Sequence, residues 1–155
     1  MRRHAGFTMV ELLVTVAILG IMTATAFPLY NKWVQRTYGS EAALTLKRIL
    51  DGEIAYILEN DDFFPEVGNP VHIYHDGKDP SAADVQRTKD ALNITLPVGH
   101  FLDFTITHGI EEDGTKFCLV DIRADFPLFK ADETHPDPTY ICAKMDEKGT
   151  ITHPY

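Results

Sequence analysis

Several side chains that can bind metals occur in the chain, but their spacing matches no complete site. His72 and His75 are three residues apart in "HIYH" and could supply half of a metal site. Two further ligands are not evident in the sequence, so a solvated loop is the favoured interpretation. The sequence also contains no phosphate-binding loop, no zinc-protease helix motif and no nucleophile elbow. We therefore expect a protein that is not an enzyme.

Acidic residues concentrate in the segment after Lys130. Asp132, Glu133 and Asp137 place oxygen ligands at short spacing, which is chemistry that Ca²⁺ accepts. The spacing of an EF-hand is absent, and acidic surface loops are common. We expect no cofactor, and these three residues are weak candidates for calcium.

The two cysteines, Cys118 and Cys142, are far apart and form no CxxC pair. An even number of cysteines in an exported chain favours a disulfide. Closing a loop of about 24 residues stabilises a fold by about 3 kcal/mol in the chain-entropy model. We expect a Cys118–Cys142 disulfide if the chain is exported, and two unpaired buried thiols are the alternative.

The most apolar stretch runs from Phe7 to Phe27, and Glu11 is its one charged residue. It meets the length of about 20 apolar residues that a helix needs to cross a bilayer. Arg2 and Arg3 precede it, as the positive-inside rule expects of a cytoplasmic end. We predict an inner-membrane helix whose C-terminal side lies outside the cytoplasm. The net charge of −9 argues against a nucleic-acid partner bound through its phosphates.

An ordinary secretory signal is the alternative interpretation of this stretch. The segment from Ala24 to Ala26 could serve as its cleavage site and would release a soluble exported binding protein or enzyme after Ala26. The acid at position 11 and the length of the apolar run argue against it, because signal cores are typically about 7–15 residues long. A local role for the acid exists as well, since Thr8 to Glu11 match a capping box at a helix start.

Helical periodicity continues beyond the apolar run. Apolar residues recur every three or four positions from Glu41 to Leu58, which predicts an amphipathic helix with one buried face. Glu53 falls outside that apolar stripe and is expected on the polar side. We predict one long helix from Phe7 to about Asn60, bent or loosened at Pro28.

The pattern changes after the long helix. Turn-forming residues and a loop follow from about Val67 to Asp84, and a short helix is predicted from Ala82 to Leu92. Alternating segments then predict two hairpins, "HFLDFTIT" with "FCLVDIRADF" and "TYICAKMD" with "TITH". The expected fold class is α+β, in which the amphipathic half of a long N-terminal helix covers a C-terminal antiparallel sheet.

The N-terminal stretch "RRHAGFTMVELLVTVAILG" resembles the leader and mature start of type IV pilins and type II secretion pseudopilins. The resemblance implies a leader over residues 1–6, cleavage between Gly6 and Phe7 by a prepilin peptidase, and N-methylation of Phe7. It identifies Glu11 with the family's acid at the fifth mature position and Pro28 with its helix-bending proline. The implied regions are 7–28 as membrane and filament-core helix, 29–60 as amphipathic helix, and 61–155 as loops and sheet.

The resemblance also implies what the chain assembles with. Glu11 of one subunit would neutralise the methylated amine of Phe7 in a neighbour, so that subunits self-associate into a helical filament. An inner-membrane assembly platform would take the single-pass precursor to an extracellular pilus or a periplasmic pseudopilus. The choice between pilus and pseudopilus stays open, because the cysteine pair favours a pilin and the acidic loop leans toward a pseudopilin.

Overall fold

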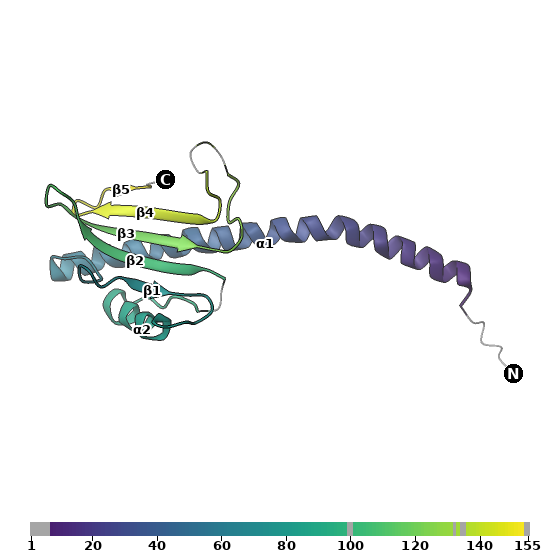
Figure 1. The fold of residues 1–155 in the computed structure, drawn as a ribbon, viewed down its shortest axis with the longest axis horizontal. Coiled ribbons are helices and arrows are strands. Elements are labelled where there is room, and N and C mark those ends of the chain that lie inside the picture. Colours follow the sequence, from purple (N-terminus) through teal and green to yellow (C-terminus); the bar gives the residue numbers. More distant parts are fainter. Residues whose placement is uncertain (1–6, 99–100, 132, 134–135, 154–155) are drawn as a thin grey trace. The chain divides into compact units, whose positions relative to one another are not determined.

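The computed structural model describes residues 7–98, 101–131, 133 and 136–153. The chain divides into two compact units, Met1–Val34 and Gln35–Tyr155, called unit 1 and unit 2 below. Figure 1 shows the order of the elements along the chain. Helix α1 (Met9–Asn60) passes through both units without interruption, as the sequence predicts. Asp61 ends it with a left-handed backbone, at φ 60°.

In unit 1, the backbone of helix α1 accepts hydrogen bonds from threonine side chains of the same helix. The hydroxyl of Thr15 donates to the carbonyl of Leu12 at 2.8 Å, and the hydroxyl of Thr23 donates to the carbonyl of Leu19 at 2.7 Å. These bonds leave no need for a solvent partner at either hydroxyl, which suits an apolar surrounding. Pro28 lies inside the helix. The bend at that residue stays a prediction.

Unit 2 contains a five-stranded antiparallel sheet in the order β1-β2-β3-β4-β5. The strands are β1 (Val71–Ile73), β2 (Asp103–Ile110), β3 (Lys116–Arg123), β4 (Tyr140–Asp146) and β5 (Ile151–Thr152). The two predicted hairpins are confirmed, with Gly114 and Gly149 at positive φ in their turns. The α+β class predicted from the sequence is therefore confirmed.

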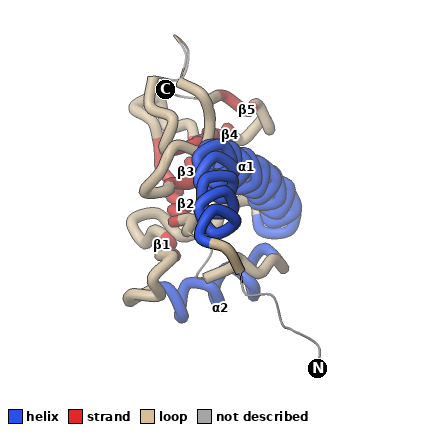
Figure 2. The backbone as a smooth tube through the Cα atoms, turned by 90° about the vertical axis from the view of Figure 1, so that its right-hand side faces the viewer, coloured by secondary structure: helices blue, strands red, loops and turns tan. Residues whose placement is uncertain are grey.

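Strand β1 lies where the sequence predicts only a loop, and helix α2 (Ser81–Leu92) explains why it forms. The Asp84 carboxylate accepts from the backbone N–H of His72 at 2.7 Å, and the Ser81 hydroxyl accepts from the N–H of Tyr74 at 2.8 Å. Side chains of α2 thus satisfy the outer edge of the sheet, which would otherwise expose unpaired backbone groups. Figure 2 shows α2 next to β1.

The core of unit 2 lies between α1 and one face of the sheet. Its helix side consists of Ala42, Leu46, Ile49 and Leu50, with Glu53 fully buried among them. The sheet contributes Phe104, Ile106, Cys118, Val120, Ile122, Ala143 and Met145. The helix therefore has one buried apolar face, as predicted, but that face lies at a different position around the helix axis. Leu58, expected on the buried face, is 82% exposed, and Glu53, expected on the polar face, is 0% exposed.

The loop between β3 and β4 folds back onto the first turns of α1 in unit 2. The Gln35 side-chain amide donates to the carbonyl of Phe129 at 2.7 Å. A Cβ atom on Gly39 would lie only 2.4 Å from the carbonyl oxygen of Leu128. Only glycine fits at position 39, because any side chain would push the loop away from the helix.

Candidate assembly and processing site

The predicted capping box at the start of α1 is present with both of its hydrogen bonds. The backbone N–H of Thr8 donates to Glu11 Oε2 at 2.9 Å, and the N–H of Glu11 donates to the Thr8 hydroxyl oxygen at 3.3 Å. The Thr8 hydroxyl also donates to Glu11 Oε2 at 2.7 Å. Thr8 is thus the N-cap, and the carboxylate is held at the positive end of the helix dipole. Gly6 lies outside the described residues, and Phe7 is 74% exposed.

The apolar part of α1 leaves its large side chains uncovered in the structure. Exposed fractions run from 51% at Val14 to 79% at Met9. This helix is long and apolar enough to cross a membrane, with a mean hydropathy of 2.1 in its most apolar window. Glu11 is the one acid in this surface. Because a surface of this kind is unstable in water, it must be covered by lipid or by protein.

The predicted Cys118–Cys142 disulfide is wrong in this structure, because the two cysteines are not bonded to each other. The pairing of β3 with β4 sets Cys118 opposite Met145 and Cys142 opposite Asp121. The cysteines are therefore offset by three residues, about 10 Å along the strands, whereas a disulfide needs Cα atoms within about 7 Å. They also point to opposite faces of the sheet, since side chains alternate along a strand.

The histidines and acids that were weighed as metal ligands do not converge. The ring of His72 stacks on Tyr74 with centroids 6.1 Å apart, whereas the Nδ1 atom of His75 lies 2.8 Å from an oxygen of Asp103. The hydrogen bond that His75 donates to the Asp103 carboxylate raises the pKa of His75. Across the part of the chain that is described, no three histidine, cysteine or acidic side chains form a metal-binding group.

The weak calcium candidates do not form a calcium site among the described residues either. Asp132 lies outside the described residues, and Glu133 is exposed. Asp137 accepts hydrogen bonds from the backbone N–H of Thr139 at 2.9 Å and from its hydroxyl at 2.7 Å. The carboxylate of Asp137 thus closes a local turn.

Sequence reasoning missed a buried carboxylate near the end of α1. Glu53 Oε2 accepts from the backbone N–H of Phe64 at 3.0 Å, while Oε1 is buried and has no hydrogen-bond partner among the described residues. Burial raises the pKa of Glu53 to about 8, so the carboxyl is protonated at neutral pH. The signal was present in the sequence, because position 53 lies three residues after Leu50 on the buried face.

A second buried polar group lies on β2. His108 Nδ1 lies 3.0 Å from the carbonyl oxygen of Pro65 and must donate to it, because a carbonyl only accepts. His108 Nε2 lies 3.6 Å from Asp62, whose carboxylate also binds the Lys116 ammonium at 2.9 Å. That hydrogen bond from Lys116 lowers the pKa of Asp62. Together with Glu53, these contacts fix the segment after α1 to the helix and the sheet.

Comparison with known proteins identifies a family motif at the N-terminal end of the chain, which contains the capping box. Residues 1–27 match the family described as the prokaryotic N-terminal methylation motif. The chain is 40% identical over 132 residues to a fimbrial protein of Dichelobacter nodosus, covering 85% of this chain and 61% of that protein. It is 39% identical over 69 residues to the type IV major pilin protein PilA of Myxococcus xanthus, covering 43% of this chain and 31% of PilA.

A third relative is the type IV major pilin protein PilE1 of Neisseria gonorrhoeae, 35% identical over 81 residues, with 52% of this chain and 37% of PilE1 covered. In each of these three alignments the chain covers less than two thirds of the relative's length. No solved structure matches the chain. The methylation motif, these relatives and the long helix packed on an antiparallel sheet together support the assignment of the chain to the type IV pilin family.

Proposed function

We propose that the chain is a structural subunit of a type IV pilus-like filament and polymerises through the N-terminal half of α1. The observation that carries the proposal is the uncovered apolar surface of this helix with a single acid in it, in a chain whose first 27 residues match the methylation motif. The precursor would span the inner membrane once, and prepilin peptidase would cut it between Gly6 and Phe7 and methylate Phe7. An assembly platform in that membrane would then move the subunit into the filament.

We propose four regions for the chain, the first of which is removed by this cut. Residues 1–6 are the leader, 7–28 the membrane and filament-core helix, 29–60 the amphipathic helix, and 61–155 the loops and sheet. In the filament, segments 7–28 of many subunits bundle together and replace the lipid. Pro28 is where the helix bends or loosens during this transfer, because proline removes one backbone hydrogen bond.

Glu11 supplies the specificity of this assembly. Cleavage leaves a free α-amine on Phe7, which is mostly cationic at neutral pH. In an apolar filament core both that amine and the Glu11 carboxylate are costly when they are unpaired. Leaving one charge of a buried pair without its partner costs about 3–5 kcal/mol, so only the stagger that joins the Glu11 carboxylate to a neighbour's Phe7 amine is favourable.

The variant Glu11→Ala tests this role directly. We expect it to be processed normally and to enter filaments poorly, and Glu11→Gln to show an intermediate defect because it keeps a hydrogen-bonding cap. Incorporation is measured by mixing tagged variant and untagged wild-type chains and quantifying the tag in sheared filaments. Incorporation of Glu11→Ala at the wild-type level would refute the register role.

A subunit of a type II secretion pseudopilus is the second candidate. The disulfide that favoured a pilus over a pseudopilus is not formed. The relatives above now favour the pilus, because they carry the names of major pilins and fimbrial proteins. A soluble exported binding protein or enzyme released after Ala26 is disfavoured, because it would discard the Thr8–Glu11 cap.

Mass spectrometry of the N-terminal peptide separates these possibilities. Filaments are sheared from the native cells and the inner membrane is fractionated in parallel. An N-methylated peptide that begins at Phe7 and is abundant in the sheared fraction identifies a pilus subunit. The same peptide confined to the inner membrane identifies a pseudopilus or minor subunit, and a peptide that begins at Phe27 refutes the filament function.

A further inference from the structure

One asparagine of the chain stands in a short sequence that can accept a sugar. Asn93 is followed two residues later by Thr95, whereas none of the other asparagines, Asn31, Asn60 and Asn69, has serine or threonine at that distance. Asn-x-Ser/Thr, with a middle residue other than proline, is the sequence at which N-linked glycans are attached to secreted proteins. Because this sequence is only three residues long, its use depends on whether the fold exposes it.

The fold presents both side chains of this sequence on the outside of unit 2. Helix α2 ends at Leu92, and the backbone N–H of Asn93 donates to the carbonyl of Lys89 at 3.1 Å. Leu92 and Leu96 are buried, whereas Asn93 and Thr95 between them are exposed. The two apolar residues therefore anchor the segment, and the two polar residues face the solvent.

Helix capping accounts for Asn93 but not for Thr95. Asn93 has a left-handed backbone at φ 55°, which asparagine adopts more readily than most residues and which commonly ends a helix. That role uses the backbone, and the side-chain amide of Asn93 makes no hydrogen bond with any other described residue. The same holds for the Thr95 hydroxyl within the described part of the chain. Both groups are thus accessible to an enzyme from outside.

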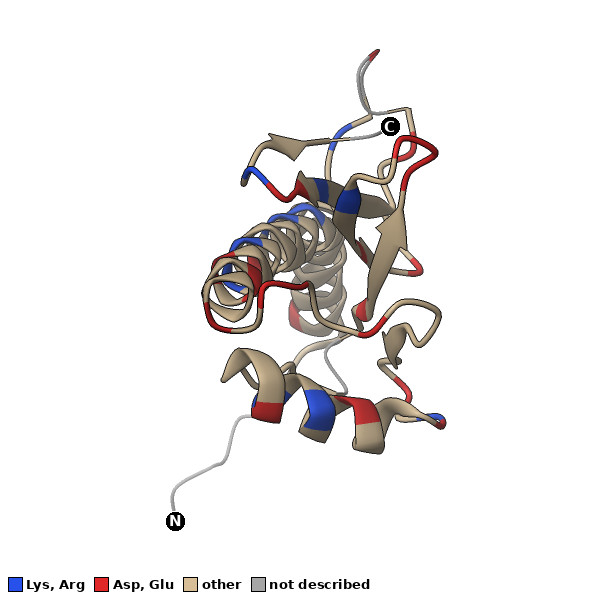
Figure 3. Ribbon diagram, turned by 90° about the vertical axis from the view of Figure 1, so that its left-hand side faces the viewer, with Lys and Arg blue, Asp and Glu red and all other residues tan. Residues whose placement is uncertain are grey.

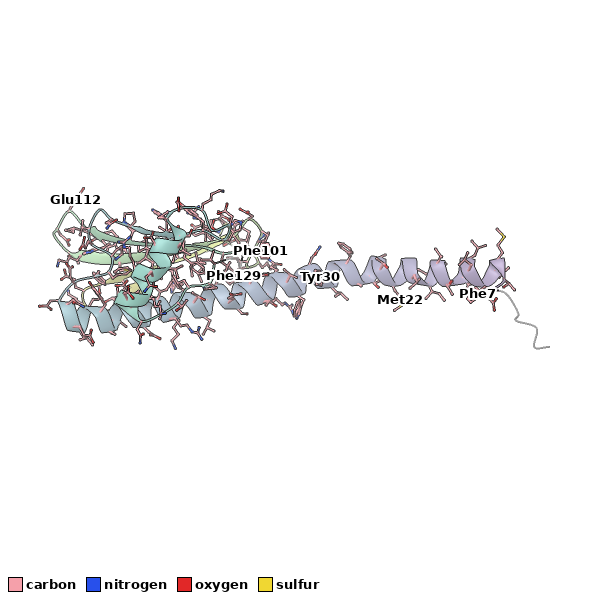
Figure 4. The ribbon with its side chains drawn as sticks, turned by 90° about the horizontal axis from the view of Figure 1, so that it is seen from below. Phe7, Met22, Tyr30, Phe101, Glu112 and Phe129 are labelled. Carbon is pink, nitrogen blue, oxygen red and sulfur yellow. The ribbon has the colours of Figure 1, made fainter. Side chains whose placement is uncertain are left out.

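The two side chains open onto a cleft of about 710 Å³ in unit 2. One wall of the cleft is the segment of residues 92–97, and the other is formed by residues of α1 between positions 41 and 55. The walls come close at Gly52, where a Cβ atom would lie 3.1 Å from that of Leu92. Figure 4, which is seen from the side of α2, shows α2 beside the part of α1 that belongs to unit 2. The cleft therefore adjoins the acceptor sequence directly.

The α1 wall of the cleft suits a neutral, hydroxyl-rich occupant. Glu41, Arg48 and Asp51 line it and carry charges of both signs, so that it attracts neither a strong anion nor a strong cation. Figure 3 shows basic and acidic residues together along this helix. Their side chains offer donors and acceptors to hydroxyl groups, and Leu44, which is 54% exposed, adds an apolar surface. Sugars match both kinds of surface, because their rings carry hydroxyl groups at the edge and C–H groups on the faces.

We propose that Asn93 is N-glycosylated and that the first sugar residues of the glycan lie in this cleft. The inference depends on the proposed pilus-like function, because that function takes unit 2 out of the cytoplasm. In the transfer, Nδ2 of Asn93 forms a bond to the anomeric carbon of a phosphate-activated sugar. The bond from that carbon to the phosphate oxygen breaks, the phosphate leaves with the electron pair, and the amide nitrogen loses a proton. The Thr95 hydroxyl is the second group that the transferase recognises.

Mass spectrometry of the chain purified from the native cells tests the modification. Trypsin gives a peptide of residues 90–116, in which Asn93 is the only asparagine. We expect this peptide to carry the mass of one or more sugar residues, located on Asn93 by electron-transfer fragmentation. A peptide that is entirely unmodified overturns the proposal. The methylated peptide that begins at Phe7 is measured in the same digest, so that failure of the filament function and failure of the glycosylation are distinguished.

Three variants expressed in the native cells identify the atom that carries the sugar. Thr95→Ala should abolish the added mass although it leaves Asn93 in place, and Thr95→Ser is the matched control that should retain it. Asn93→Asp should also abolish it, and this change is conservative for the helix end because aspartate tolerates a left-handed backbone. An added mass that survives Asn93→Asp but is lost in Thr95→Ala would place the sugar on the threonine hydroxyl and overturn the N-linkage.

Thiol alkylation, followed by mass spectrometry of the peptide that contains the probe, measures whether the glycan occupies the cleft. Leu44→Cys places a probe in the cleft wall, and Leu58→Cys, at an 82% exposed position of the same helix outside the lining, is the matched control. We expect the thiol at position 44 to react several-fold more slowly in the glycosylated chain than in one that also carries Thr95→Ala. The thiol at position 58 should react equally in both. Equal rates at position 44 would overturn the placement of the glycan in the cleft.

Discussion

The substitution Glu53→Gln should stabilise unit 2 at neutral pH. The folded-state pKa of Glu53 is about 8, against 4.5 for an ordinary glutamate, so the folded chain holds a proton that the unfolded chain releases. Between pH 4.5 and 8 the unfolded state binds fewer protons, and this group's contribution to stability therefore falls as the pH rises. Glutamine retains an oxygen that accepts from the Phe64 N–H, and it does not ionise in either state.

The magnitude follows from the shift in pKa. Each unit is worth about 1.36 kcal/mol, and pH 7 lies about 2.5 units above the unfolded-state pKa, so retaining the proton costs the fold about 3 kcal/mol at pH 7. Replacing Glu53 by glutamine removes that cost. The gain of about 3 kcal/mol is an upper value, because the extra amide N–H groups must be accommodated where Oε1 has no hydrogen-bond partner among the described residues.

Urea unfolding of the full chain in detergent, followed by near-ultraviolet circular dichroism, measures this effect. The wild type should lose stability steadily from pH 5 to pH 8, and Glu53→Gln should have a flatter profile and a higher midpoint at pH 7. Glu59→Gln is the matched control, because Glu59 is exposed on the same helix. Parallel pH profiles for wild type and Glu53→Gln would refute the reasoning, since they would mean that Glu53 ionises normally in the folded chain.

Three further predictions test the packing, the cysteines and the surface charges. Gly39→Ala should destabilise unit 2 by about 1–3 kcal/mol, read as a lower thermal midpoint, because its Cβ would meet a carbonyl oxygen at 2.4 Å. Alkylation under denaturing, non-reducing conditions should modify both Cys118 and Cys142, and a mass two units lower with no alkylation would restore the disulfide. His75 has a raised pKa because of Asp103, so its contribution to stability should be present below about pH 6.5 and lost as the pH rises through the raised value. Asp103→Asn should weaken that dependence in thermal melts, since Asp125 and Asp76 also raise the pKa of His75, and an unchanged profile would contradict the role of Asp103.

The sequence predicted the features that depend on local pattern. The capping box needs only Thr8 and Glu11 three residues apart, and the structure forms both of its hydrogen bonds. The end of α1 at Asn60 was predictable because turn-forming residues follow it. The alternation of buried and exposed side chains in β2 and β3 was also predictable, because a period of two residues is a property of any strand.

The features that failed depend on contacts distant in sequence. A disulfide between β3 and β4 requires the register of the strands, and Cys118 and Cys142 miss each other by three positions. Strand β1 exists because α2 supplies acceptors for its edge, which no local pattern encodes. Glu53 is tolerated on the buried face because the chain turns back after α1 and presents the N–H of Phe64 to it.

The two carboxylates of α1 at positions 11 and 53 show how one helix can serve two environments. Glu53 is buried within its own subunit, where it stays neutral and makes its contacts inside unit 2. Glu11 is exposed and capped only by Thr8, so its charge is available to a partner outside the chain. Leu44, Ile54 and Leu58 also remain 40–82% exposed on the same helix. In the proposed filament, neighbouring helices would cover the apolar surface of residues 7–27, and Glu11 is the one charge within that surface.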